Sequence, residues 1–123
     1  MEKNKKVLII EDDKFLLKAC VIKFKKEGIN VITATDGVAG LELAKKEIPV
    51  LILLDLLLPR MNGFEFLKKI KSDEQTKDIP VLITSVLGQK TDQEKAISLG
   101  AEDYFIKANY KLEEIVGKVK DYL

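Results

Sequence analysis

Histidine is absent from this sequence of 123 residues, and cysteine occurs only once, at Cys20. Without histidine the chain lacks the usual general base and the usual imidazole ligand for zinc, and it can form no phosphohistidine of its own. A single cysteine allows no internal disulfide, which suits a reducing compartment. Because Cys20 lies in an apolar helical pattern, we expect its thiol to be a small buried side chain.

Long apolar runs and a bias in charge are also missing. No apolar run reaches the ~18 residues that a membrane span needs, and no segment has the pattern of a signal peptide. Lys and Arg number 21 against 20 Asp and Glu, so the net charge is +1. No segment has the character of a basic recognition helix. We therefore expect a cytoplasmic protein with no membrane partner and no direct DNA binding.

Short apolar runs alternate with longer helical patterns along the chain. The runs are continuous rather than alternating with polar residues, which is typical of strands covered on both faces. They occupy residues 7–10, 29–34, 50–54, 81–84 and 104–106, and the helical patterns occupy residues 14–27, 36–47, 63–71, 91–100 and the chain after residue 109.

Residues with known preferences mark the ends of these helices. Gly28 and Gly100 should end the first and the fourth helix, and Asp36 should cap the second. Thr91 and Glu94 have the spacing of a capping box, which predicts that the fourth helix opens there. The last helix should place one apolar stripe against the core, made of Leu112, Ile115, Val116, Val119 and Leu123.

Five successive strand and helix pairs predict an α/β fold with a parallel sheet and helices on both faces. Right-handed crossovers leave few topologies, and the common solution for five strands is the flavodoxin-like, doubly wound (βα)5 arrangement with strand order 2-1-3-4-5. The length fits one domain, so we expect residues 1–123 to form a single unit.

Acidic residues follow the strands that should flank the switch point of this sheet. Glu11, Asp12 and Asp13 end the first run, and Asp55 ends the third within "LILLDLLLPRMNG". Asp13 could cap the following helix, and Asp55 could simply end its strand. However, packed carboxylates repel one another unless a cation joins them, and Mg²⁺ prefers such oxygen ligands. The pattern therefore favours a magnesium site.

Two further strand ends should face the same crevice. Thr84 ends the fourth strand and Lys107 follows the fifth. A carboxylate nucleophile, a cation, a hydroxyl donor and a metal site together suit phosphoryl transfer to an aspartate. Asp55 would attack phosphorus, while Mg²⁺, Lys107 and Thr84 would neutralise the equatorial oxygens.

Four stretches, "VLIIEDD", "LILLDLLLPRMNG", "VLITS" and "GAEDYFIKA", resemble the receiver domain of two-component response regulators, and the resemblance covers essentially the whole chain. It implies that Asp55 accepts a phosphoryl group from a histidine kinase or phosphotransfer protein. It further implies that Glu11 and Asp12 bind Mg²⁺, with a backbone carbonyl from Leu57. The chain would then not be a dedicated enzyme, although it would catalyse its own phosphorylation and dephosphorylation to a limited extent.

The resemblance also implies a conformational switch. Thr84 matches the switch hydroxyl and Tyr104 the aromatic residue that moves inward on activation, although an amphipathic ring at the sheet edge is the alternative for Tyr104. The change would remodel the face made by the fourth helix, the fifth strand and the fifth helix, and so control a downstream protein effector. We expect no effector domain after Leu123, so that the chain would be either a stand-alone regulator or one domain cut out of a larger protein.

The sequence departs from the family pattern after the lysine, where Ala108 replaces the usual proline. A cis bond at alanine would cost roughly 3–4 kcal/mol, so we expect a trans bond and a Lys107 that is placed differently or more loosely. Ser85 stands where the family favours Ala or Gly. Leu57 and Val86 are apolar at positions that line the path of the hydrolytic water, which predicts slow loss of phosphate.

Other functions are compatible with parts of the pattern. A receiver-like interaction module that works without phosphorylation would explain Ala108. A flavodoxin-type cofactor binder would share the fold, but the acids at residues 11–13 would repel its phosphate. A haloacid-dehalogenase-like phosphatase usually needs a second Asp two residues after the nucleophile, where this chain has Leu57.

Gly63, in the "PRMNG" turn, is expected to adopt backbone angles that a side chain would penalise.

Overall fold

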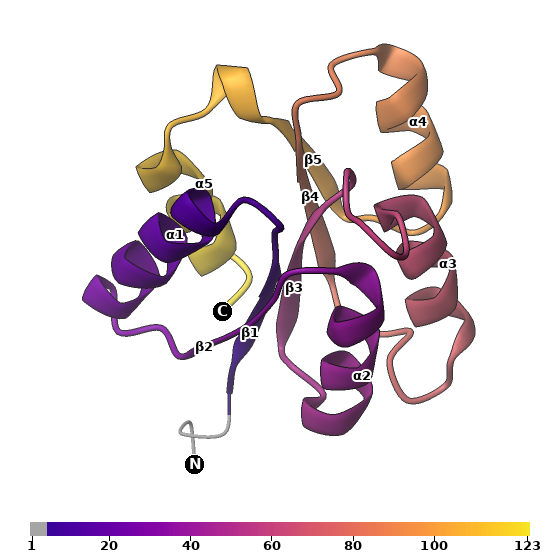
Figure 1. The fold of residues 1–123 in the computed structure, drawn as a ribbon, viewed down its shortest axis with the longest axis horizontal. Helices are drawn as coiled ribbons and strands as arrows, with labels where there is room; N and C mark the ends of the chain where they lie inside the picture. Colours follow the sequence, from indigo (N-terminus) through magenta and orange to yellow (C-terminus); the bar gives the residue numbers. More distant parts are fainter. Residues whose placement is uncertain (1–4) are drawn as a thin grey trace.

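The computed structural model describes residues 5–123 and contains one parallel sheet with the strand order β2-β1-β3-β4-β5. This confirms the predicted flavodoxin-like order, and Figure 1 shows the sheet between two groups of helices. The strands are β1 (Val7–Ile10), β2 (Val31–Ala34), β3 (Leu51–Asp55), β4 (Val81–Ser85) and β5 (Asp103–Ile106), and the helices are α1 (Lys14–Lys26), α2 (Gly37–Glu47), α3 (Gly63–Ser72), α4 (Lys90–Ser98) and α5 (Leu112–Lys120).

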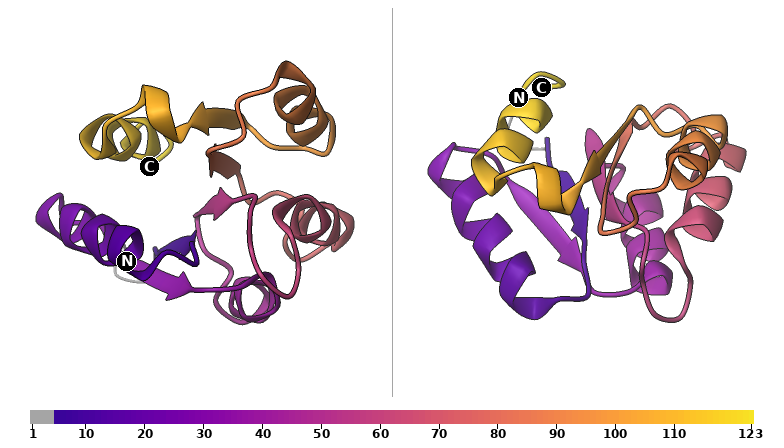
Figure 2. Two further views of the ribbon diagram at one scale, coloured as in Figure 1. Left: turned by 45° about the horizontal axis from the view of Figure 1, so that its top comes forward. Right: turned by 90° about the horizontal axis from the view of Figure 1, so that it is seen from above.

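Helices cover both faces of the sheet, which explains why its strands are continuously apolar. In Figure 2, left, α1 and α5 lie on one side of the sheet and α2, α3 and α4 on the other. Each side has its own core: Phe24 and Val119 pack over the first face, and Phe66 and Ala96 over the second. Every residue of β1, β3 and β4 is buried. Burial of this apolar surface is the main force that holds the fold together.

The side chains of Asp13, Asp36 and Asn62 cap the first turns of α1, α2 and α3. Asp36 accepts a hydrogen bond from the Ala39 N–H at 2.8 Å, which confirms the predicted cap of α2. Asn62 caps α3 in the same way, because its Oδ1 accepts a hydrogen bond from the Glu65 N–H at 3.0 Å. Such caps satisfy backbone donors that would otherwise lack a partner at the first turn.

Several predicted boundaries were wrong. The strand β2 begins at Val31, two residues later than predicted. The helix α4 begins at Lys90 after Gln89, without a side-chain cap, so Thr91 lies inside the first turn and forms no capping box. The helix α5 ends at Lys120, and Leu123 lies beyond it with 52% of its surface exposed. The apolar pattern alone could not place these ends, because tertiary contacts decide where a terminal turn frays.

Gly63 is required for close packing rather than for its backbone angles. Its φ is not among the positive values of this chain, which contradicts the prediction. A Cβ at this position would lie 2.6 Å from the Cα of Leu56 and 3.0 Å from the Asp55 carbonyl oxygen. Gly63 therefore lets α3 begin directly against the end of β3, next to the site.

We expect Gly63→Ala to lower the free energy of unfolding by about 1–3 kcal/mol, because backbone atoms would have to move apart. The matched control is Gly117→Ala in α5, where an added Cβ meets nothing within 4 Å. That substitution should raise stability by about 0.5–1 kcal/mol, because alanine is the better helix former. Urea unfolding of both variants tests the pair, and equal effects would contradict this account of Gly63.

Within residues 5–123, no helix has both the length and the apolar character needed to cross a bilayer.

Candidate phosphorylation and metal site

The candidate site lies at the carboxyl edge of the sheet, where the predicted side chains follow their strands. Asp55 is the last residue of β3 and is paired in register with Thr84 of β4. Glu11 directly follows β1, and Lys107 directly follows β5. Figure 2, right, looks onto this edge. Parallel strands thus bring residues from four distant segments together at this edge.

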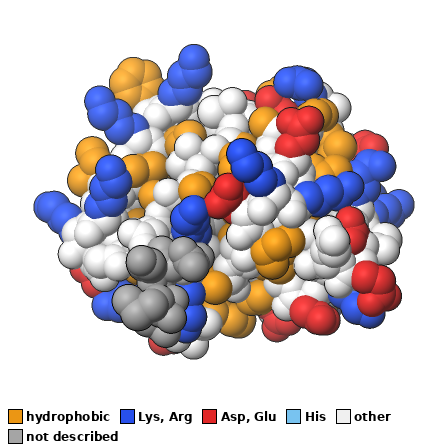
Figure 3. Space-filling model, turned by 90° about the horizontal axis from the view of Figure 1, so that it is seen from below, with side chains coloured by type: hydrophobic (Ala, Val, Ile, Leu, Met, Phe, Trp, Pro, Cys, Tyr) orange, Lys and Arg blue, Asp and Glu red, His pale blue; other side chains and the backbone are white. Residues whose placement is uncertain are grey.

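At the opposite edge of the sheet, seen in Figure 3, basic and acidic side chains are both spread over the surface.

Three carboxylates form a cluster at this edge. Glu11, Asp12 and Asp55 each offer an oxygen, and these oxygens all lie within 4.8 Å of one another. Glu11 and Asp55 are buried and Asp12 is exposed. Asp13 has a separate role, because its Oδ1 accepts hydrogen bonds from Phe15 and Leu16 at the start of α1. The cluster offers hard oxygen ligands only, which fits Mg²⁺ and not zinc.

Lys107 reaches the carboxylates directly. Its Nζ lies 2.7 Å from Glu11 Oε1 and 3.1 Å from Asp55 Oδ2, and its side chain is only 20% exposed. Every peptide bond between residues 5 and 123 is trans, as expected for the Lys107–Ala108 bond. Although we expected Lys107 to be placed differently or more loosely without the proline, its Nζ reaches both carboxylates. The short 3-10 helix at Lys107–Asn109 carries the chain away after the lysine without the need for a proline.

Burial and charge compete at this cluster. Burial raises the pKa of the Glu11 carboxyl, and the hydrogen bond from Lys107 offsets only part of that rise. Burial by itself lowers the pKa of the Lys107 ammonium, but its hydrogen bond to Glu11 and the charge of Asp55 outweigh burial, so that this pKa is raised. Of the two partners, Glu11 is thus the one whose charged form burial disfavours.

We expect Glu11→Gln to raise the free energy of unfolding of the metal-free chain at pH 7, because burial raises the pKa of the Glu11 carboxyl and so penalises the charged carboxylate but not the neutral amide. A carboxyl group whose pKa is raised on folding lowers the free energy of unfolding once the pH rises above the pKa of that group in the unfolded chain. For Glu11 this reference pKa is 4.5. The advantage of the variant should therefore disappear below that pH, where Glu11 is protonated in both states. Thermal unfolding at pH 4 and pH 7 measures this; a gain that is independent of pH would count against it.

The second group of predicted residues, on β4 and β5, lies beside the cluster. Thr84 is buried in β4, directly before Ser85, which is the last residue of this strand. Tyr104, on the edge strand β5, is only 8% exposed, and its hydroxyl donates a 2.7 Å hydrogen bond to the Leu87 carbonyl. The Ser85 hydroxyl accepts a hydrogen bond from the Leu87 N–H at 3.1 Å. Both side chains therefore hold the loop between β4 and α4.

Leu87 is a part of this site that the sequence did not reveal. It contributes a backbone carbonyl and a backbone N–H, which every residue except proline possesses, so its side chain carries no signal. A similar contact was missed at Leu57, whose N–H donates to Asp55 Oδ1 at 3.1 Å. Leu57 and Val86 are 48% and 63% exposed, and we call these two exposed apolar residues the apolar rim.

A family model for the response regulator receiver domain matches residues 7–120. The chain belongs to this family. Its curated relatives include the DNA-binding dual master transcriptional regulator RpaA of Synechocystis, which is 38% identical over 118 residues, covering 96% of this chain and 48% of that protein. The alkaline phosphatase synthesis transcriptional regulatory protein PhoP of Bacillus subtilis is 32% identical over 98% of this chain and 49% of its own length. The receiver domain thus spans about half the length of these relatives.

Solved structures agree with this assignment. The receiver domain of Francisella response regulator 1452 superposes with a TM-score of 0.88 at 28% identity, covering 96% of this chain and 95% of that one. The chemotaxis protein CheY4 of Vibrio cholerae gives a TM-score of 0.88 at 26% identity over 97% and 98% of the two chains. Receiver domains are parts of two-component response regulators, so this chain is a signalling domain and not a conventional enzyme.

Proposed function

We propose that this receiver domain is a switch controlled by phosphorylation of Asp55. The observation that carries the proposal is the contact between Lys107 and Asp55 at 3.1 Å, beside the carboxylates of Glu11 and Asp12. A nucleophilic carboxylate, a fixed cation and a cluster that suits a divalent metal are the groups that phosphoryl transfer needs. The apolar walls of β1 and β3 keep the Asp55 carboxylate positioned and partly desolvated.

In the proposed reaction, an Asp55 carboxylate oxygen attacks the phosphorus of a phosphohistidine on a kinase or phosphotransfer protein. The new O–P bond forms as the P–N bond breaks, and the imidazole leaves with its electron pair. Glu11, Asp12 and the Leu57 carbonyl would hold Mg²⁺, which when bound supplies positive charge to the phosphoryl oxygens. Lys107 pairs with one of these oxygens, and the Thr84 hydroxyl donates to another. Acetyl phosphate could replace the protein donor.

The conformational response would run through the loop between β4 and α4. As Thr84 moves toward the phosphoryl group, the loop that follows it must also move. The Tyr104 ring is already largely buried, so we infer that Tyr104 transmits this change through its hydrogen bond to Leu87 and not by a large rotation out of solvent. The face formed by α4, β5 and α5 would then exist in two packings, and phosphate would shift the population between them.

The partners of the switch follow from these roles. The donor would be a histidine kinase or phosphotransfer protein, and the recipient of the signal a downstream protein that distinguishes the two packings. We infer a cytoplasmic location, no membrane contact and no direct DNA binding by this chain. The two transcriptional regulators to which it is similar are about twice its length.

The decisive experiment uses beryllofluoride, which mimics a phosphoryl group on the carboxylate of Asp55. With Mg²⁺ present, we expect saturable shifts of the backbone amide resonances of Thr84, Leu87 and Tyr104. Asp55→Ala should abolish them, because the attacking oxygen is gone. The matched control is Asp13→Asn, which removes a neighbouring charge but keeps a side chain that can cap α1. If neither the unmodified domain nor the control responds, the proposed function is wrong.

A receiver-like interaction module that needs no phosphate is the competing function. The sequence observation that favours it is Ala108, which stands in place of proline. Against it, Lys107 lies within reach of Asp55 despite that substitution. If a partner bound the domain equally well with Asp55→Ala and with beryllofluoride, the interaction module would be the better description.

A further inference from the structure

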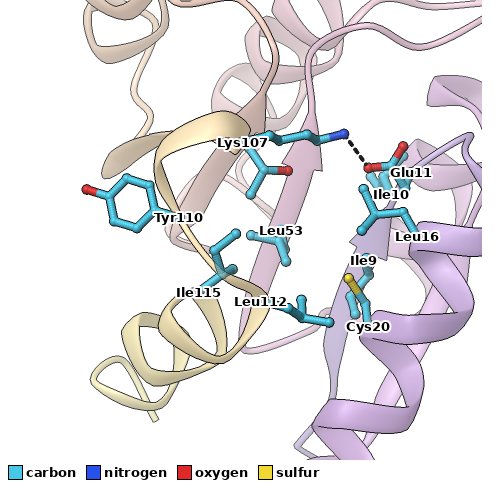
Figure 4. A pocket seen from close by; sticks show the side chains of 11 residues that line it. Ile9, Ile10, Glu11, Leu16, Cys20, Leu53, Lys107, Tyr110, Leu112 and Ile115 are labelled. Carbon is cyan, nitrogen blue, oxygen red and sulfur yellow. Dashed lines mark hydrogen bonds and ion pairs between the residues drawn. The ribbon is translucent and has the colours of Figure 1, made fainter.

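A cavity of about 100 Å³ lies between α1 and α5, directly under the cluster of Glu11 and Lys107. Figure 4 shows side chains from both helices and from the sheet around this space, with the pair of Lys107 and Glu11 across its upper end. Ile9 and Leu53 come from the sheet, Cys20 from α1 and Ile115 from α5. The cavity shares Glu11 and Lys107 with the candidate site at its upper end, and the rest of its walls is mainly aliphatic.

The charges at the upper end of the cavity are already satisfied by each other (Figure 4). Lys107 donates to Glu11 at 2.7 Å and to Asp55 at 3.1 Å. An anionic ligand would meet two carboxylates with their cation already engaged, and a cationic ligand would have to displace the Lys107 ammonium. Below the pair of Lys107 and Glu11, an ionised group would lose its hydration and find no group of opposite charge. The cavity therefore excludes ions and favours a neutral, apolar occupant.

Size restricts the occupant further. An apolar cavity of about 150 Å³ engineered into another protein stays dry and binds benzene, so a cavity of about 100 Å³ takes a compound no larger than benzene. A ligand of the right shape would gain dispersion contacts with the side chains that line the cavity. The Cys20 thiol belongs to the wall as a small apolar group, since burial raises its pKa to about 11 and keeps it protonated.

We propose that this cavity is a binding site for a small, neutral, apolar molecule. Its position would make it regulatory, because Thr84 and Lys107 line both the cavity and the candidate phosphorylation site. When these two side chains are drawn toward a phosphoryl group, the upper wall of the cavity changes. A ligand that fits one form better would then change the affinity for phosphate, and phosphate would change the affinity for the ligand by the same factor. This regulatory step rests on the proposed function, whereas the binding step does not.

Benzene is the probe for binding, and NMR of methyl groups is the readout. We expect saturable shifts at Ile9, Leu53 and Ile115, with little change at Ile79 and Val81, which belong to the core on the other face of the sheet. Cys20→Met should weaken binding at least tenfold, because the longer side chain occupies the cavity. Cys20→Ser preserves the volume and should retain binding within about threefold. Benzoate, which adds a carboxylate to the same ring, should bind at least tenfold more weakly than benzene.

Three results would overturn the binding site: no saturable shift, equal shifts on both faces of the sheet, or unchanged affinity in a folded Cys20→Met variant. A titration with beryllofluoride and Mg²⁺ at saturating benzene then tests the regulatory step, for which we expect at least a threefold change in beryllofluoride affinity. If benzene binds and beryllofluoride does not, the proposed function fails and the ligand site stands. If both bind without affecting each other, the site exists but is not regulatory.

Discussion

The phosphate on Asp55 should be lost slowly, over minutes or longer, and Leu57→Asn with Val86→Gln should shorten its lifetime by about tenfold to a hundredfold. Hydrolysis needs a water molecule that is positioned and polarised next to phosphorus, and a well-placed polar group typically contributes about 10²-fold or more to such a step. Leu57 follows Asp55 by two residues, Val86 follows Thr84 by two, and both side chains are largely exposed and apolar. Neither of these apolar side chains can orient a water molecule, whereas the amide side chains of the introduced Asn and Gln can.

The measurement is the decay of the aspartyl phosphate after acetyl phosphate is removed, with Mg²⁺ kept constant. Ile22→Asn is the matched control, because Ile22 is another half-exposed aliphatic side chain, on α1. It should leave the lifetime unchanged. If the unmodified domain lost its phosphate completely within seconds, or if the control accelerated the loss as much as the double variant, the apolar rim would not be what governs the lifetime.

The second large effect should come from Lys107→Met. In the absence of metal, the unfolding free energy should fall by about 1–3 kcal/mol, less than for a fully buried pair because the lysine side chain is 20% exposed. The cause is the repulsion among Glu11, Asp12 and Asp55 once the ammonium is gone. Below pH 4.5, the reference pKa of the Glu11 side chain, protonation should reduce this loss. Beryllofluoride affinity should also drop at least tenfold, because one fixed partner of the phosphoryl oxygens is missing.

Magnesium provides the discriminating measurement for this variant. Because a divalent cation can replace the lost charge, Mg²⁺ should stabilise Lys107→Met more than it stabilises the unmodified domain. Lys71→Met is the matched control: Lys71 is also partly buried, but it donates to the carbonyls of Lys77 and Ile79, away from the cluster. Its loss of stability should not respond to Mg²⁺. An equal response in both variants would contradict the role assigned to Lys107.

Local sequence signals predicted most of the fold. The five apolar runs and the caps at Asp13 and Asp36 identified the elements, because strand burial and helix capping depend on neighbouring residues. The order of the strands followed from the βα repeat and the handedness of its crossovers. The signals failed at the start of α4 and at the end of α5, where the final turn depends on packing. They also gave the wrong reason for Gly63. Its close contact with Leu56 packs the start of α3 against the chain just after β3, and a local pattern does not show such a contact.

The sequence by itself determined the family, the strand order and the residue types at the strand ends: three carboxylates, a threonine and a lysine, with an aliphatic strand leading to Asp55. Only the tertiary structure decided how these groups meet. It brings Lys107 into contact with Glu11 and Asp55 although no proline follows the lysine. It also buries Tyr104, whose hydroxyl donates to the Leu87 carbonyl, and forms a cavity between α1 and α5. The physical reason is that pairing and packing depend on distances between segments up to 96 positions apart, which no local pattern encodes.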